Sequence, residues 1–157
     1  MAIDNKTSFV LTVYPIAERI RLNDSNTAHP LFVTAQAALE TGWKLRNDYN
    51  LFGIKAGTTW TGKTSTLQTK EYVNGQMVSV NQKFRVYDNL EQALKDHQAI
   101  LHLKGYADAW TSKDDPYQFA EKIVDNVGSK YATDPNYAKK MKQIIDEVYK
   151  IVLDNKL

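Results

Sequence analysis

A turn signal in the middle of the chain constrains the fold more than any other feature. Asn74 and Gly75 join two β-prone runs, TLQTKEYV and QMVSVNQKFRVY. An Asn-Gly pair in this setting is the strongest short-range signal for a β-hairpin, because both residues tolerate the positive φ angles of a two-residue turn. We therefore expect a small β lobe over about residues 64–88.

Helical periodicity precedes the hairpin. Apolar residues recur at helical spacing over residues 6–22, which predicts an amphipathic helix. A second helix is expected from about Pro30 through the segment LFVTAQAALE, ending at Gly42. This segment is apolar on most faces, so it is predicted to be the central buried helix. Residues 53–63, rich in glycine and threonine, predict an irregular loop before the hairpin.

Three more helices are expected after the hairpin, each with a start signal. Residues 88–91 match a capping box. Asp115-Pro116 and Asp134-Pro135 each offer an N-cap residue followed by proline in the first helical turn. The chain is therefore predicted to be one α+β domain over residues 1–157, mostly helical, with the β lobe inserted between the second and third helices.

Composition excludes several classes of protein. The 157 residues are 43% hydrophobic, which is enough for one domain with a core. No apolar run approaches the ~18 residues of a membrane span. The absence of cysteine excludes disulfides and thiolate chemistry. A net charge of +2 does not indicate nucleic-acid binding, and we expect a monomeric chain with no nucleic-acid partner.

The three histidines do not predict a metal site. His29 lies in a predicted loop, while His97 and His102 are five residues apart and do not share a helix face well. The chain also lacks a glycine-rich phosphate loop and a nucleophile motif such as G-x-S-x-G. We therefore expect neither a metal nor another cofactor.

Glu40 is the strongest candidate for acid catalysis. It falls in the last turn of the apolar helix, where unpaired carbonyl groups carry partial negative charge. That charge, with desolvation by neighbours such as Trp43 or Phe52, disfavours the ionised carboxylate. A carboxyl group that stays protonated near neutral pH is suited to act as a general acid. Position alone also fits an ordinary solvated glutamate near a helix end.

Glu71 is the candidate for a second carboxylate. Strand alternation places it on the hairpin face that carries Leu67, Thr69 and Val73. Two carboxyl groups facing each other across a groove suit glycoside hydrolysis, in which an acid and a base or nucleophile flank the bond. The alternative is an exposed glutamate paired with Lys70 or Lys83.

Aromatic side chains gather in the segments around the loop, the hairpin and the final connection. Most such residues belong to cores, but aromatic rings on loops beside a groove also stack on sugar faces. The candidates for such contacts are Trp43, Tyr49, Phe52, Trp60, Tyr72, Tyr131 and Tyr137.

Several motifs in order resemble the glucosaminidase family of peptidoglycan hydrolases, glycoside hydrolase family 73. They are AQAALETGW, NLFGIKAG, a downstream W-T-G, T-K-E-Y, F-R-V-Y and KYATDPNYAKK, and they extend from about Phe9 to Ile145. The resemblance implies a lysozyme-like fold, with a substrate groove between a helical body and a β lobe. It also implies that the substrate is the glycan strand of peptidoglycan.

The resemblance also assigns residues. The family's essential glutamate falls on Glu40, and its proposed second carboxylate falls on Glu71. Groups near the sugar fall on Asn50, Phe52 and Tyr131. We add Trp60 and Tyr137 as substrate-binding candidates. The chain departs from the family pattern at Lys44, where the family usually has glycine after the tryptophan of the glutamate motif.

The resulting hypothesis is an endo-β-N-acetylglucosaminidase that acts in the cell envelope or outside the cell. The first residues, MAIDNKTSFV, do not form a signal peptide. We therefore expect a phage-encoded enzyme, one delivered by another route, or a trimmed piece of a longer chain. Two alternatives stay open within the enzyme class: an N-acetylmuramidase and a lytic transglycosylase. A third is a wall-binding module without activity.

The mechanism also stays open at this stage. Glu71 as a base that activates water predicts inversion, with the carboxyl groups ~6.5–9.5 Å apart. Glu71 as a nucleophile predicts retention at ~5–5.5 Å. In a third route the substrate's own 2-acetamido oxygen attacks, helped by Tyr131 or Glu71. We favour the first and third routes, and we expect the β lobe to move because only one turn and one packed face hold it.

Overall fold

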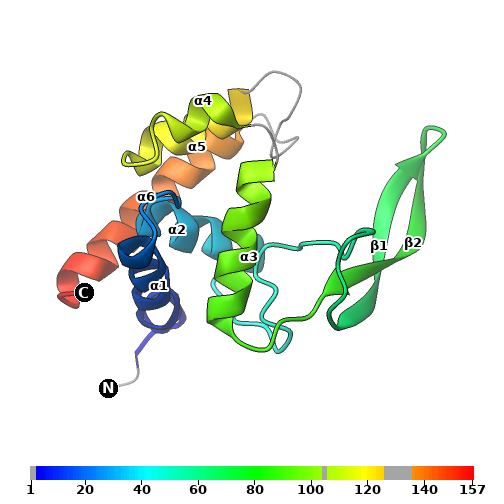
Figure 1. Cartoon of the computed structure of the whole chain (residues 1–157), viewed down its shortest axis with the longest axis horizontal. Helices are drawn as coiled ribbons and strands as arrows, with labels where there is room; N and C mark the ends of the chain where they lie inside the picture. The colour runs from blue at the N-terminus through cyan, green and yellow to red at the C-terminus, as the bar shows by residue number, and fades with distance from the viewer. Residues whose placement is uncertain (1–2, 104–105, 126–135) are drawn as a thin grey trace.

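The computed structural model describes residues 3–103, 106–125 and 136–157. A helical body fills one side of the molecule, and a long β-hairpin extends from it (Figure 1). The elements in chain order are α1 (Asn5–Asn23), α2 (Pro30–Thr41), β1 (Thr64–Val73), β2 (Gln76–Arg85), α3 (Leu90–Leu103), α4 (Ala107–Trp110), α5 (Pro116–Asp125) and α6 (Tyr137–Asp154). This arrangement confirms the predicted α+β class.

Helix α2 forms the centre of the body. Nearly all of its side chains are buried, and it contacts α1, α5 and α6. Its Phe32 ring packs edge-on against Phe119 of α5 at 4.7 Å between centroids. Gly42 ends the helix in the left-handed region, at φ 66°, as the sequence predicts. Full burial of a side chain such as Phe32 contributes about 1.5–3 kcal/mol to the free energy of unfolding. The many buried side chains of α2 therefore stabilise the helical body.

The hairpin has the predicted turn. Val73 pairs with Gln76, and Asn74 and Gly75 take φ angles of 51° and 79°, which a type I′ turn requires. One face of the hairpin is half-buried along much of its length and includes Thr69, Glu71 and their partners on β2, while the opposite face is exposed. Among the described residues, neither strand packs extensively against a helix.

Two of the three later helix starts can be compared with the prediction. Helix α5 begins as expected, because the Asp115 carboxylate accepts hydrogen bonds from the backbone N–H groups of Tyr117 and Gln118. The capping box expected at residues 88–91 is displaced by one residue. Asn89 caps α3 by accepting from the N–H of Gln92, and the Gln92 side chain accepts from the N–H of Asp88.

The remaining differences lie near the C-terminal part. The start signal at Asp134-Pro135 lies outside the described residues, and the described part of the last helix begins at Tyr137 after the cap residue Asn136. The short helix α4 has no counterpart in the prediction, since a single helical turn carries too few residues for a periodic pattern.

None of the described helices combines the length and hydropathy needed to cross a membrane.

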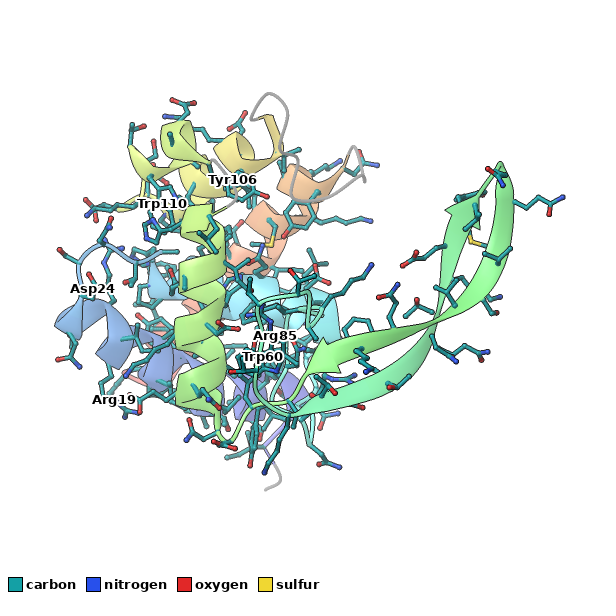
Figure 2. All side chains as sticks on the ribbon, turned by 45° about the vertical axis from the view of Figure 1, so that its right-hand side comes forward. Arg19, Asp24, Trp60, Arg85, Tyr106 and Trp110 are labelled. Atoms are coloured by element: carbon teal, nitrogen blue, oxygen red, sulfur yellow. The ribbon has the colours of Figure 1, made fainter. Side chains whose placement is uncertain are left out.

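A hairpin-base cluster of Trp60, Arg85, Tyr87 and Asp96 fastens the β-hairpin to α3. The Arg85 guanidinium donates to Asp96 at 2.8 Å and to the carbonyl of Lys55 at 3.1 Å, and the Tyr87 hydroxyl donates to the same Asp96 carboxylate. Arg85 also lies 4.9 Å from the centroid of the Trp60 ring. Figure 2 shows Trp60 and Arg85 together where the hairpin leaves the helical body.

Gly62 completes this cluster by allowing the indole to approach the backbone. A Cβ atom at this position would lie 2.4 Å from Cζ2 of Trp60, so any side chain here would displace the ring. The Trp60 indole N–H donates to the carbonyl of Lys63 at 2.9 Å, which closes the loop around it.

The first prediction concerns Asp96. Replacing it with alanine leaves the half-buried Arg85 guanidinium without its carboxylate, so the free energy of unfolding should fall by about 2–3 kcal/mol. Denaturant unfolding measures this. The control is Glu91→Ala on the same helix, which removes an exposed pair with Arg19 and should cost less than about 1 kcal/mol. Equal losses in the two variants would contradict a special role for the cluster.

His97 is a buried histidine in the core of the body. Its ring stacks on Phe52 at 3.6 Å between centroids, and neither ring nitrogen has a hydrogen-bond partner among the described residues. Burial lowers the pKa of His97 from 6.5 to about 3. The ring is therefore neutral at physiological pH, as expected for a core histidine.

The second prediction follows from that pKa. Below pH 6.5 the unfolded chain takes up a proton at His97 that the folded chain does not, so the free energy of unfolding should decline as pH falls from 6.5 toward 3. The slope from this residue is at most about 1.4 kcal/mol per pH unit. His97→Phe removes the buried imidazole and should flatten the profile. An unaltered slope in His97→Phe would refute the assignment.

Candidate functional site

A groove of about 440 Å³ lies where the helical body meets the base of the hairpin. Its walls come from the end of α2, the loop that follows and the first part of the hairpin. They consist of Glu40, Thr41, Lys44, Leu45, Arg46, Asp48, Asn50, Leu51, Gly53, Leu67 and Phe84. Leu67 and Phe84 supply apolar surface on the hairpin side, and the loop supplies the charged groups.

Glu40 sits in the last turn of α2, where the helix emerges from the core. Its side chain is open to solvent on the groove side, but surrounding protein atoms still desolvate the carboxyl group. This desolvation raises the pKa of Glu40 above its usual value, and no charged neighbour adds to the shift. The sequence predicted a partly desolvated carboxyl group at this helix end, and the raised pKa of Glu40 agrees with that expectation.

Tyr137 lies close to Glu40. It is buried, and its hydroxyl accepts a hydrogen bond from the Gln36 amide at 2.7 Å. Burial is the main cause of the raised pKa of Tyr137, and the negative charge of Glu40 adds to it. Gln36 is one turn before Glu40 on α2, so the first residue of α6 and two successive turns of α2 meet beneath the groove. Contact of Tyr137 with substrate stays a prediction.

Asn50 lines the groove but is also bound to the backbone. Its amide N–H groups donate to the carbonyls of Ile54 and Arg85, and its amide oxygen accepts from the N–H of Ile54. These bonds tie the loop to the end of β2. The predicted contact of Asn50 with substrate stays a prediction, and its observed contacts position the groove wall.

Glu71 lies outside the residues that line the groove. It shares a hairpin face with Leu67, four residues earlier, which corresponds to about 13 Å of strand. Its partner is Lys55 at 3.0 Å, in place of the expected Lys70 or Lys83. The reason is that Lys55 forms an isolated bridge with Phe84, which brings this loop residue onto the same face of the hairpin.

The other predicted binding residues take different positions. Phe52 is buried and stacked on His97, and Trp60 lies in the hairpin-base cluster with its ring edge-on to Tyr87 at 5.5 Å. Tyr131 lies outside the described residues. For all three, contact with substrate stays a prediction.

Sequence reasoning missed Arg46 and Asp48, two charged residues of the loop after α2. Arg46 and Asp48 form a double hydrogen bond, at 3.1 and 2.9 Å, and the Asn50 N–H also donates to Asp48. Gln36 was also missed, although a lone amide inside an apolar helix, one turn before Glu40, was a readable signal. Lys55 was not readable, because its bridge to Phe84 depends on how the loop folds back.

The groove can perform acid-assisted cleavage of a bond to oxygen. Glu40 supplies a carboxyl group with a raised pKa, and apolar walls on the hairpin side suit the faces of a sugar. Histidine and acidic side chains of the described residues form no group of three or more that would hold a metal ion.

Comparison with known proteins identifies the family. The model of the glucosaminidase family, described as mannosyl-glycoprotein endo-β-N-acetylglucosaminidase, matches residues 18–150. Peptidoglycan hydrolase FlgJ of Salmonella typhimurium is 38% identical over 138 residues, which cover 83% of this chain and 42% of that protein. A probable N-acetylmuramidase of Lactococcus lactis is 33% identical over 157 residues, covering 93% of this chain and 34% of that protein. The chain thus spans less than half the length of these relatives.

Solved structures agree in fold. A peptidoglycan hydrolase mutant from Sphingomonas sp. A1 superposes with a TM-score of 0.76 at 36% identity, covering 94% of this chain and 99% of that one. The catalytic domain of the autolysin Auto from Listeria monocytogenes gives a TM-score of 0.80 at 25% identity, covering 98% and 89%. Together with the family match, these findings confirm the lysozyme-like architecture and the resemblance drawn from the motifs. This chain belongs to the glucosaminidase family and is a glycoside hydrolase domain.

Proposed function

We propose that this domain is an endo-β-N-acetylglucosaminidase that cleaves the glycan strands of peptidoglycan, with Glu40 as the general acid. The observation that carries the proposal is the position of Glu40, at the solvent end of a buried helix and in the wall of a groove, with its pKa raised by desolvation. Relatives named as peptidoglycan hydrolases support the substrate. Such a substrate implies action at the cell envelope or outside the cell.

A second candidate function is that of an N-acetylmuramidase. The observation in its favour is the Lactococcus relative with that name, which matches 93% of this chain. The two activities cut alternate bonds of the same strand, and a lytic transglycosylase would leave a 1,6-anhydro end. Digestion of purified glycan strands, borohydride reduction and mass spectrometry of the reduced end distinguish the three. Reduced N-acetylglucosamine supports the proposal, and reduced N-acetylmuramic acid supports the alternative.

In the proposed mechanism, Glu40 donates its proton to the glycosidic oxygen as the bond to the anomeric carbon breaks. A carboxyl group with a raised pKa carries that proton at a pH where an ordinary glutamate has lost it. Leu67 and Phe84 would lie against the sugar from the hairpin side. The developing oxocarbenium ion then receives either water or the substrate's own acetamido oxygen.

The role of Glu71 depends on hairpin movement. In this structure it pairs with Lys55, on the far side of Leu67 from the groove. A base that activates water would need the two carboxyl groups within about 6.5–9.5 Å. Bending of the hairpin about its base would shorten the distance, and the few contacts of its strands with the described helices permit such bending. We therefore keep Glu71 as water-activating base and substrate assistance as the two routes.

The third prediction tests Glu40. Glu40→Gln keeps the shape of the side chain but removes the transferable proton, so the rate of strand hydrolysis should fall by about 10²–10⁴. In the wild type, activity should persist to higher pH than an ordinary glutamate allows, and decline as pH rises through the raised pKa. Both are measured as release of reducing ends.

Glu147→Gln is the matched control, because Glu147 is a half-exposed carboxylate on α6 that pairs with Lys6 away from the groove. This variant should keep its activity. Circular dichroism and thermal unfolding confirm that both variants are folded. Near-wild-type activity in folded Glu40→Gln would reject Glu40 as the acid.

The fourth prediction separates the routes for Glu71. If Glu71 activates water, Glu71→Ala should lose about 10²–10⁴ in rate, and added azide should restore turnover as the α-glycosyl azide. If the acetamido group of the substrate attacks, the wild-type product should retain its configuration and azide should have little effect. Nuclear magnetic resonance of fresh product reads the anomer. A glycosyl ester trapped on Glu71 would exclude both routes.

A further inference from the structure

The charged side chains of the groove wall do not all form pairs with each other. Arg46 and Asp48 neutralise each other through two hydrogen bonds. Glu40 is the other acidic group of the wall, and its raised pKa favours the neutral form. Lys44 is the remaining charged residue of the wall, and its ammonium group has no hydrogen bond or ion pair with any described residue. The wall thus includes an exposed lysine without a counter-ion among the described residues.

The backbone holds Lys44 just past the acid. Gly42 ends α2 in the left-handed region, and the Lys44 N–H donates to the Thr41 hydroxyl at 3.3 Å. Lys44 therefore follows Glu40 around the end of the helix and lies in the same groove wall. The ammonium does not act on the acid itself, since desolvation alone accounts for the shift at Glu40. Lys44 is available for a different group of the substrate.

The proposed cleavage defines which substrate group comes near. When an N-acetylglucosaminyl bond is cut, the leaving oxygen is on C4 of N-acetylmuramic acid. The neighbouring C3 carries a lactyl ether, to which the peptide stem is attached. Because Glu40 must reach the C4 oxygen, the C3 substituent has to lie beside Glu40. That substituent bears the nearest carboxylates of an otherwise neutral glycan.

We propose that Lys44 binds a carboxylate carried by the C3 substituent of the leaving N-acetylmuramic acid, and that it is a specificity-determining residue of the groove. The inference rests on the proposed function, because it requires the bond assignment given above. The adjacent Leu45 is 50% exposed and also lines the groove, so it offers apolar contact for the lactyl methyl group. A charged and an apolar contact side by side match the two chemical parts of a lactyl group.

The carboxylate has two chemical sources. In strands without stems it is the lactyl carboxylate itself. In strands with stems the lactyl carboxyl is an amide, and the first free carboxylate is the α-carboxylate of the second residue, glutamate. The experiment therefore uses strands without stems, strands with free glutamate, strands with the glutamate amidated, and oligomers of N-acetylglucosamine, which have no carboxylate.

The fifth prediction compares wild type, Lys44→Met and Lys44→Arg on these substrates. Lys44→Met should raise KM about tenfold, with kcat unchanged, on at least one of the two carboxylate-bearing strands. It should have little effect on amidated strands and on N-acetylglucosamine oligomers. Lys44→Arg should restore most of the affinity, and added salt should weaken the wild type more than Lys44→Met. The control is Lys150→Met, an exposed lysine of α6 outside the groove, which should match the wild type.

Binding to the Glu40→Gln protein keeps this test independent of activity. Calorimetric titration compares Glu40→Gln with the double variant Glu40→Gln/Lys44→Met on the same four substrates. The double variant should lose affinity selectively for the carboxylate-bearing strands. Equal affinity of the two proteins for every substrate, or an equal loss on charged and neutral ones, would overturn the assignment of Lys44. The wild-type product could instead give reduced N-acetylmuramic acid after borohydride treatment. A selective loss of binding would then support the contact of Lys44 with the carboxylate and reject the proposed cleavage of the N-acetylglucosaminyl bond.

Discussion

Burial of α2 on nearly every face is the constraint on which the rest of the structure depends. A helix that is apolar all round must be surrounded, and α1, α5 and α6 surround it. Glu40 is in the last turn, so it lies where the burial ends. A glutamate one turn earlier would be inside the core, and one turn later it would be fully solvated. The position of Glu40 along this helix thus determines both its exposure in the groove and its raised pKa.

The hairpin is stabilised in a different way. Its strands pair mainly with each other, and the attachment to α3 runs through Arg85, Tyr87 and Asp96. The contacts of the hairpin with the helical body are thus concentrated at its base, near the groove. Glu71 lies on the outer part of the hairpin, where Lys55 holds it in the present conformation. Glu40 is therefore carried by the buried helix, and Glu71 by an arm that has few contacts with the described helices.

Local patterns predicted those parts of the fold that local forces determine. The hairpin turn, the buried helix with its terminal glycine, and the start at Asp115 each depend on residues close in sequence. The predicted position of the capping box was wrong by one residue, because Asp88 and Asn89 are equally good N-cap residues. The motifs led to Glu40, but the contacts of Glu71 and Trp60 depend on the path of the loop through Lys55 and Lys63, which no periodicity encodes.

One wall of the groove holds both a carboxyl group with a raised pKa and a lysine side chain. A cation close to Glu40 would favour the ionised carboxylate and so weaken the acid. The chain avoids this by pairing Arg46 with Asp48 and by placing Lys44 beyond the glycine that ends α2. Desolvation therefore remains the cause of the raised pKa of Glu40. Gly42 thus separates the proposed acid from the proposed carboxylate-binding residue within one groove wall.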